Sequence, residues 1–73
     1  MIEVIEKVQD NVRVYEAVRN DRVVGKARVR NQYRPTRGMC VTFTTRTTKD
    51  ARAVLEEKIR GDLQHLHRPF FWA

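Results

Sequence analysis

The sequence predicts an α+β fold, a three- or four-stranded antiparallel sheet with one C-terminal helix packed on one of its faces. Apolar and polar residues alternate with period two through most of residues 2–46, which is typical of half-buried strands. Apolar residues then recur at every fourth position from Ala51 to Leu63, which is typical of an amphipathic helix. A chain of 73 residues with 41% hydrophobic content suffices for one thin core. We therefore expect one domain over residues 1–68 and an aromatic tail over residues 69–73.

The first strands follow from this alternation and from one turn. Residues 2–8 suit a first or edge strand. Residues 12–19 and 22–30 predict a hairpin, because the Asn-Asp pair between them tolerates the left-handed conformation of a tight turn. With a two-residue loop at 20 and 21, the numbers of paired residues sum to 41, which sets the register. The core face is then expected to consist of Val12, Val14, Val18, Val23, Ala27 and Val29.

The second half is expected to supply one more strand and the helix. A strand over residues 39–46 follows a polar loop over residues 31–38. Thr47, followed three residues later by Asp50, resembles a capping box and predicts the start of the helix. Gly61 lowers helix stability by about 1 kcal/mol relative to alanine, and we expect it to end or bend the helix. The stripe that packs on the sheet comprises Ala51, Leu55, Ile59 and Leu63, flanked by Val54 and Leu66.

The segment after Pro69 carries three large aromatic residues, Phe70, Phe71 and Trp72. Two interpretations remain open. The segment docks on the thin core, which we favour because so small a domain needs apolar area. Alternatively it is an apolar anchor for another protein, since large exposed aromatics at a chain end promote association.

The net charge of +6 is unevenly distributed along the chain. Residues 22–49 contain eight bases and no acid, whereas the remaining residues together carry a charge of −2. A segregated positive charge attracts phosphates or acidic protein surfaces. The sequence therefore predicts a basic surface for an anionic partner, with a merely solvated surface as the alternative.

The side chains that carry catalytic chemistry are scarce. The chain has no serine, and its one cysteine, Cys40, is expected to be an inert side chain on a strand. His65 and His67 are two apart, which does not place both imidazoles on one metal in a helix. The glycines are scattered and form no phosphate-binding loop. We expect a protein that is no enzyme and has no metal or other cofactor.

The location of the protein is suggested by what the sequence lacks. The N-terminal residues are charged where a signal peptide is apolar, and the longest apolar run is far shorter than a membrane span. A single cysteine forms no internal disulfide. We expect a cytoplasmic monomer without a membrane partner, in the bacterial host cytosol if the chain is encoded by a phage.

The junction from Thr42-Phe43-Thr44-Thr45 into Lys49-Asp50-Ala51-Arg52-Ala53 resembles a strand, threonine-rich turn and helix start found in two families. These are the DNA-binding domains of plant ethylene-response factors and the arm-binding domains of tyrosine recombinases. The resemblance covers about residues 12–63 and implies that an exposed sheet face enters the major groove. That face would present Arg13, Tyr15, Arg22, Lys26, Arg28, Thr42, Thr44 and Arg46.

A second resemblance is one of kind. A very short, serine-free chain with a basic surface and an aromatic end is similar to the compact bacteriophage transcription regulators that bind host RNA polymerase. It implies a protein that alters initiation or termination by binding near nucleic acid, and this is the first prediction of function; direct DNA binding through the sheet is the alternative. The residues expected to bind the polymerase or the nucleic acid are Arg13, Tyr15, Arg19, Arg22, Lys26, Arg28, Arg30, Tyr33, Arg34, Arg37 and Arg46.

Overall fold

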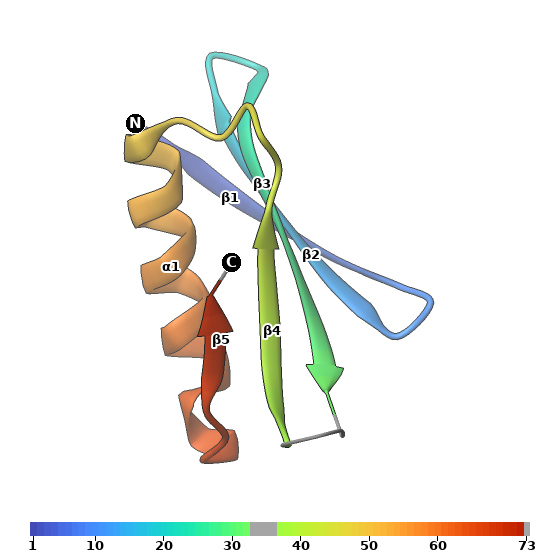
Figure 1. The fold of residues 1–73 in the computed structure, drawn as a ribbon. Helices are drawn as coiled ribbons and strands as arrows, with labels where there is room; N and C mark the ends of the chain where they lie inside the picture. The colour runs from blue at the N-terminus through green and yellow to red at the C-terminus, as the bar shows by residue number, and fades with distance from the viewer. Residues whose placement is uncertain (33–36, 73) are drawn as a thin grey trace.

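Five strands form one sheet in the order of the sequence, and a single helix lies across one of its faces (Figure 1). The structure is a computed structural model that describes residues 1–32 and 37–72. The predicted α+β class is confirmed, but the sheet is mixed, because a fifth strand runs parallel to the fourth. The elements are β1 (Glu3–Gln9), β2 (Val12–Arg19), β3 (Arg22–Gln32), β4 (Gly38–Phe43), α1 (Lys49–Leu63), the short 3₁₀ helix η1 (Gln64–Leu66) and β5 (Phe70–Trp72).

Two tight turns connect the first three strands. Asn20 and Asp21 have φ values of 51° and 62°, and Asp10 and Asn11 have φ values of 48° and 66°. Positive φ at both central residues is the requirement of a type I′ turn, whose twist matches that of the strands it joins. The hairpin predicted around residues 20 and 21 is therefore confirmed, and an Asp-Asn pair makes the preceding hairpin in the same way.

A β-bulge lies just inside the second hairpin. Val18 pairs with Val23, as the sum of 41 predicts, but the register shifts there and Ala17 pairs with Gly25. Val24 is the extra residue on β3. Neighbouring side chains on a strand point to opposite faces of the sheet. The extra residue therefore reverses which β2 side chains share a face with the β3 side chains from Gly25 onward. The predicted pairing of Val14 with Ala27 is therefore wrong, since Ala27 pairs with Tyr15.

The core lies between α1 and the sheet face that the bulge selects. The predicted stripe of α1 is buried on this face, as are Ala27 and Val29 of β3. Val12, Val14 and Val18, expected on the core face, instead lie on the opposite face of β2. The buried core cluster comprises Tyr15, Ala17, Ala27, Val29, Met39, Val41, Ala51, Leu55, Ile59 and Leu63.

The start of α1 lies close against β3. A Cβ atom on Gly25 would lie 2.7 Å from Thr47 Cγ2 and 2.9 Å from Ala51 Cβ, so only glycine leaves room for the helix start. Thr48 is the N-cap, and its hydroxyl accepts a hydrogen bond from the Ala51 amide. The capping role expected of Thr47 is wrong, because the Thr47 side chain hydrogen-bonds to the backbone of Lys26 instead. α1 continues through Gly61 to Leu63.

The aromatic segment docks on the sheet as β5. Phe70, Phe71 and Trp72 pair in parallel with Met39, Cys40 and Val41 of β4. Phe70 and Trp72 pack against the core, and the Trp72 ring stacks with the Phe43 ring at a centroid distance of 6.2 Å. The Arg60 guanidinium of α1 lies 4.6 Å from the centroid of the Trp72 ring. β5 is thus part of the same sheet as β1, β2, β3 and β4.

Gly25 of β3, which lies against the start of α1, and Gly61, within α1, predict opposite stability changes. Gly25→Ala should lower the free energy of unfolding by about 1–3 kcal/mol, because the added methyl group overpacks the contact with Thr47 and Ala51. Gly61→Ala should raise it by about 1 kcal/mol, since Gly61 is exposed, helical and has open space around a Cβ atom. Urea denaturation of both variants measures the two changes. A stable Gly25→Ala variant would contradict the close approach.

Trp72 and Phe71 provide a matched pair for the docking of β5. Trp72→Ala should destabilise the protein by about 2–3 kcal/mol, because the half-buried indole stacks with Phe43 and Phe70 over the core. Phe71→Ala should cost less than half as much, since Phe71 lies on the other face and is 37% exposed. Thermal unfolding followed by circular dichroism tests this. Equal effects of the two substitutions would contradict the docked arrangement.

Candidate functional site

The face of the sheet opposite α1, which we call the open face, has no helix over it (Figure 1). Lys26, Arg28 and Arg30 occupy alternate positions of β3 and lie on this face together. At about 3.3 Å per strand residue, the three bases form a row about 13 Å long. The register places Thr42 of β4 opposite Arg28 and Cys40 opposite Arg30. This row is the densest basic feature of the described sheet.

An apolar residue of β2, Val14, lies beside the basic row. Val14 lies between Lys7 of β1 and Arg28 of β3 in the pairing of the three strands. Although no helix covers it, Val14 is only 8% exposed. Because long basic side chains lie along apolar surface and keep their charged ends in water, we infer that the stems of Lys7 and Arg28 cover Val14.

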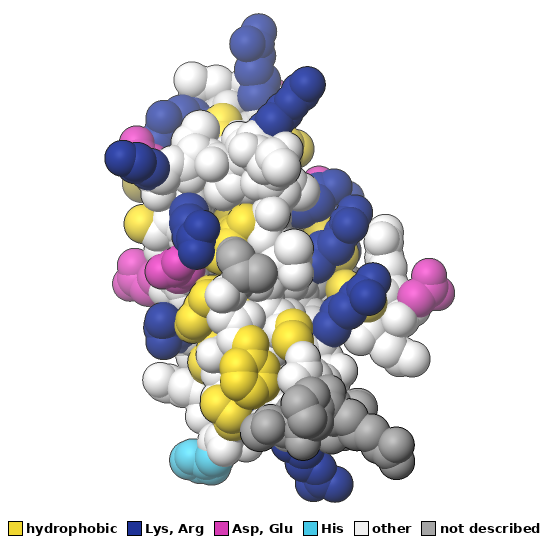
Figure 2. Space-filling model, in the orientation of Figure 1, with side chains coloured by type: hydrophobic (Ala, Val, Ile, Leu, Met, Phe, Trp, Pro, Cys, Tyr) yellow, Lys and Arg dark blue, Asp and Glu magenta, His cyan; other side chains and the backbone are white. Residues whose placement is uncertain are grey.

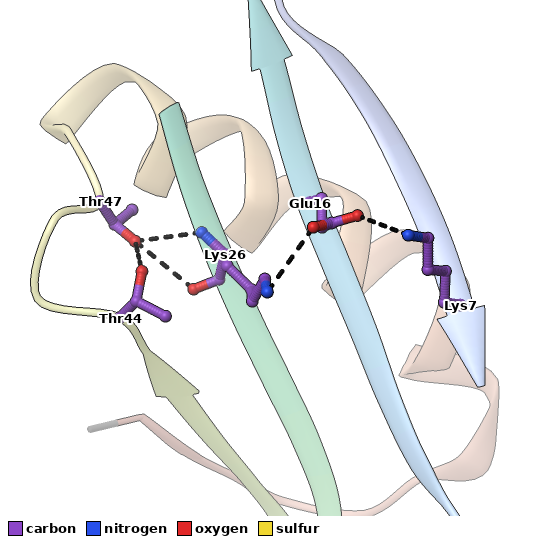
Figure 3. A network of polar contacts seen from close by, with 5 residues as sticks. All are labelled: Lys7, Glu16, Lys26, Thr44 and Thr47. Atoms are coloured by element: carbon purple, nitrogen blue, oxygen red, sulfur yellow. Dashed lines mark hydrogen bonds and ion pairs between the residues drawn. The ribbon is translucent and has the colours of Figure 1, made fainter. Parts of the chain in front are cut away.

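Glu16 is the acid nearest to the centre of the open face, and two lysines hold it (Figure 3). Its carboxylate oxygens lie 3.1 Å from Lys7 Nζ and 3.6 Å from Lys26 Nζ. The hydrogen bond with Lys7, helped by the positive charges of both lysines, lowers the pKa of Glu16 below its ordinary value of 4.5. Glu16 therefore stays ionised and offsets much of the charge of Lys7 and Lys26.

The threonines of the connection between β4 and α1 tie this cluster to the helix start (Figure 3). Thr47 Oγ1 accepts a hydrogen bond from the Lys26 amide at 3.2 Å and lies 3.0 Å from Thr44 Oγ1. The Thr44 amide donates to the Lys26 carbonyl at 3.0 Å. The backbone of Lys26 is thus held from the helix side, while its side chain reaches Glu16 on the open face.

Further bases lie at the end of the sheet near the second hairpin turn. Arg46 and Lys26 line a shallow hollow of about 290 Å³ together with Thr44 and Thr45. Figure 2 shows Lys and Arg side chains from the top of the molecule down its right side, with few acidic side chains among them. Six exposed arginines form no ion pair with any residue that the structure describes: Arg22, Arg28, Arg30, Arg37, Arg46 and Arg60.

Four residues expected on the exposed basic face lie elsewhere because of the β-bulge, and one of them, Arg22, pairs directly with Arg19 next to the second turn. Tyr15 is fully buried under α1, where its hydroxyl donates to Asp62 Oδ2 at 3.3 Å. Burial, together with the nearby Glu6 and Asp62 carboxylates, raises the pKa of Tyr15. Arg13 lies on the α1 side of the sheet and pairs with Glu6 at 2.9 Å. Arg19 lies 3.8 Å from Asp50 at the start of α1.

The remaining predicted binding residues belong to the segment between β3 and β4 and to the aromatic tail. Arg37 is exposed just before β4. Tyr33 and Arg34 lie outside the described residues.

Of the three tail aromatics, only Phe71 is classed as exposed, at 37% of its surface, and it lies beside Cys40 with its ring over Gly38. The apolar anchor expected from three aromatics is thereby reduced to one ring.

Cys40 is half-buried, and its thiol donates to Gln32 Oε1 at 2.7 Å. No group of three or more His, Cys, Asp or Glu side chains suited to a metal ion occurs in residues 1–32 and 37–72. Across the same residues, no helix is both long and apolar enough to span a membrane. The arrangement suits binding of an anionic surface through charge.

Sequence reasoning missed the residues that shape the open face between the bases, namely Lys7, Val14 and Glu16. One signal was present, because Glu16 has the same strand phase as Val14 and Val18. A core face containing those valines would also have buried an acid opposite Gly25. In the bulged register Val14, Glu16 and Val18 lie on the open face, where Glu16 reaches Lys7 and Lys26. The need to keep this acid out of the core favours the bulged register.

Comparisons with protein-family models, with curated proteins and with solved structures give no match to this chain.

The cluster around Glu16 predicts a specific pH dependence of stability. Since the folded-state pKa of Glu16 is lowered, its stabilisation is present above pH 4.5 and is lost as the pH falls through the folded-state pKa. Wild type should therefore be more stable than Glu16→Gln at pH 7, and the difference should shrink toward pH 3. Melting temperatures across this range measure it. As a control, Glu57→Gln, at an exposed helix position, should leave the pH profile unchanged. A constant gap between wild type and Glu16→Gln would contradict the assignment.

Proposed function

We propose that this chain is a non-enzymatic DNA-binding protein that uses its open face to bind the phosphate backbone and groove of duplex DNA. The observation that carries the proposal is the row of Lys26, Arg28 and Arg30 on an uncovered sheet face, in which the two arginines have no acidic partner among the described residues. An unneutralised arginine pair on a flat surface is stabilised by an external anion.

The chemistry of the row suits DNA. The planar guanidinium of arginine donates two parallel hydrogen bonds to a phosphate or to a guanine edge. The row is about 13 Å long, comparable with the roughly 12 Å width of the major groove. Thr42, opposite Arg28, adds a hydroxyl that both donates and accepts. Arg46, beside Lys26, extends the positive surface toward the hairpin turn.

The structure changes the balance between the two functions that the sequence suggested. Binding to RNA polymerase would need a basic surface together with an aromatic anchor. Phe70 and Trp72 instead pack against the protein's own core, under Arg60. The basic surface favours DNA without needing such an anchor. The polymerase partner, and with it a role in phage transcription, stays a prediction.

Titration of binding against salt tests the proposal. Fluorescence anisotropy with a short labelled duplex should give a log–log slope of about −0.9 for each phosphate contacted. Arg28→Ala and Arg30→Ala should each make the slope shallower by about one unit. Lys58→Ala is the matched control, because Lys58 lies on α1 and pairs with Asp62. It should leave the slope unchanged.

Two outcomes would contradict the proposal. One is a lack of duplex binding at low salt. The other is equal loss of affinity in Lys58→Ala and Arg28→Ala, which would indicate attraction by net charge rather than by the open face. A nuclease-insensitive complex with bacterial core RNA polymerase, formed without duplex binding, would favour the first prediction instead.

A further inference from the structure

β1 leaves one edge of the sheet open. It is the outermost strand on its side, pairs with β2 alone among the described strands and is seven residues long. Ile5 is 45% exposed and Val8 is 65% exposed, one on each side of the strand. An uncovered edge of this length offers unpaired backbone groups to another strand.

The backbone groups that face outward follow from the first hairpin. In a two-residue hairpin the residues next to the turn, here Gln9 and Val12, form a hydrogen-bonded pair. Because such pairs alternate along antiparallel strands, Lys7, Ile5 and Glu3 also direct their backbone groups toward β2. The outward groups therefore belong to the even-numbered residues, Val4, Glu6 and Val8.

When two copies of β1 pair in antiparallel fashion, the residues whose backbone groups point outward must hydrogen-bond to one another. This requirement leaves few possible registers. With Ile5 on the two-fold axis, Val4 hydrogen-bonds to Glu6 of the second copy, and Glu3 lies opposite Lys7. Ile2 then meets the exposed Val8. A register with Glu6 on the axis places two glutamates face to face, and one with Lys7 on the axis places two lysines together. Like charges directly opposite are destabilising, whereas opposite charges and apolar pairs stabilise.

We propose that this chain forms a two-fold symmetric dimer through β1, with Ile5 on the axis. The interface is completed by two Glu3–Lys7 ion pairs, and Lys7 remains within reach of its own Glu16. The dimer replaces the monomer expected from the sequence. It is independent of DNA binding, since no residue of the basic row takes part.

The dimer joins the two sheets into one of ten strands. A two-fold axis between antiparallel edge strands is perpendicular to the sheet, so both open faces point the same way. Five strand spacings of about 4.8 Å separate the two copies of β3, which places the basic rows about 24 Å apart. The interface is narrow, and dissociation on dilution is expected.

Sedimentation of the full chain over a range of concentrations tests the assembly. The mass should rise from 8.7 kDa toward twice that value with increasing concentration. Glu3→Lys should raise the dissociation constant at least tenfold, because each new lysine faces Lys7 of the other copy. Glu57→Lys makes the same change of charge on α1 and should leave it unchanged. A chain that stays monomeric at millimolar concentration overturns the proposal, as does equal weakening by both variants.

A cysteine on the axis tests the register separately. In a Cys40→Ala background, Ile5→Cys should form an intermolecular disulfide under mild oxidation, because non-hydrogen-bonded partners have Cα atoms about 4.5 Å apart. Gln9→Cys, on the same side of β1, should not, since the two cysteines would lie about 27 Å apart. Equal cross-linking of both variants would overturn the register. Circular dichroism confirms that each variant is folded.

Discussion

The contact between Gly25 and the start of α1 is the constraint on which the rest of the structure depends. Thr47 and Ala51 pack directly on this glycine, so β3 must present Gly25 to the helix. Val24, just before it, is the extra residue of the bulge, and the bulge decides which face of β2 is buried. Tyr15 and Ala17 enter the core, while Val14 and Glu16 move to the open face. The location of the core and the composition of the basic face are therefore two results of one local packing requirement.

The charges of the chain serve two different purposes. On the α1 side, Arg13 and Arg19 pair with acids, and Arg52 and Arg60 lie over aromatic rings. These arginines join elements of the fold. On the open face, Glu16 engages two lysines but no acid reaches Arg28 or Arg30 among the described residues. Net charge alone does not separate the two groups, because the separation depends on which side of the sheet each residue occupies.

The small size of the domain explains why its chain end is a strand. A core built from one helix and short aliphatic side chains gains needed apolar area from Phe70 and Trp72. β5 also covers the edge of β4, so the edge strands of the sheet are the seven-residue β1 and the three-residue β5. The same arrangement removes aromatics from the surface and limits what apolar contact a partner can make. Partner recognition then relies on charge and on strand edges.

The sequence by itself determined the α+β class, the hairpin at Asn20 and Asp21, the stripe of α1 and the charge of the middle section. These are local properties, because period-two and period-four patterns, turn residues and charge runs involve neighbours in the chain. Only the tertiary structure decided the face of each β2 residue, the N-cap at Thr48 and the parallel docking of β5. A single extra residue reverses a strand's faces, and whether it is inserted depends on contact between Gly25 and residues more than twenty positions away. No strand pattern contains that contact, although Glu16 among the valines carried a trace of it.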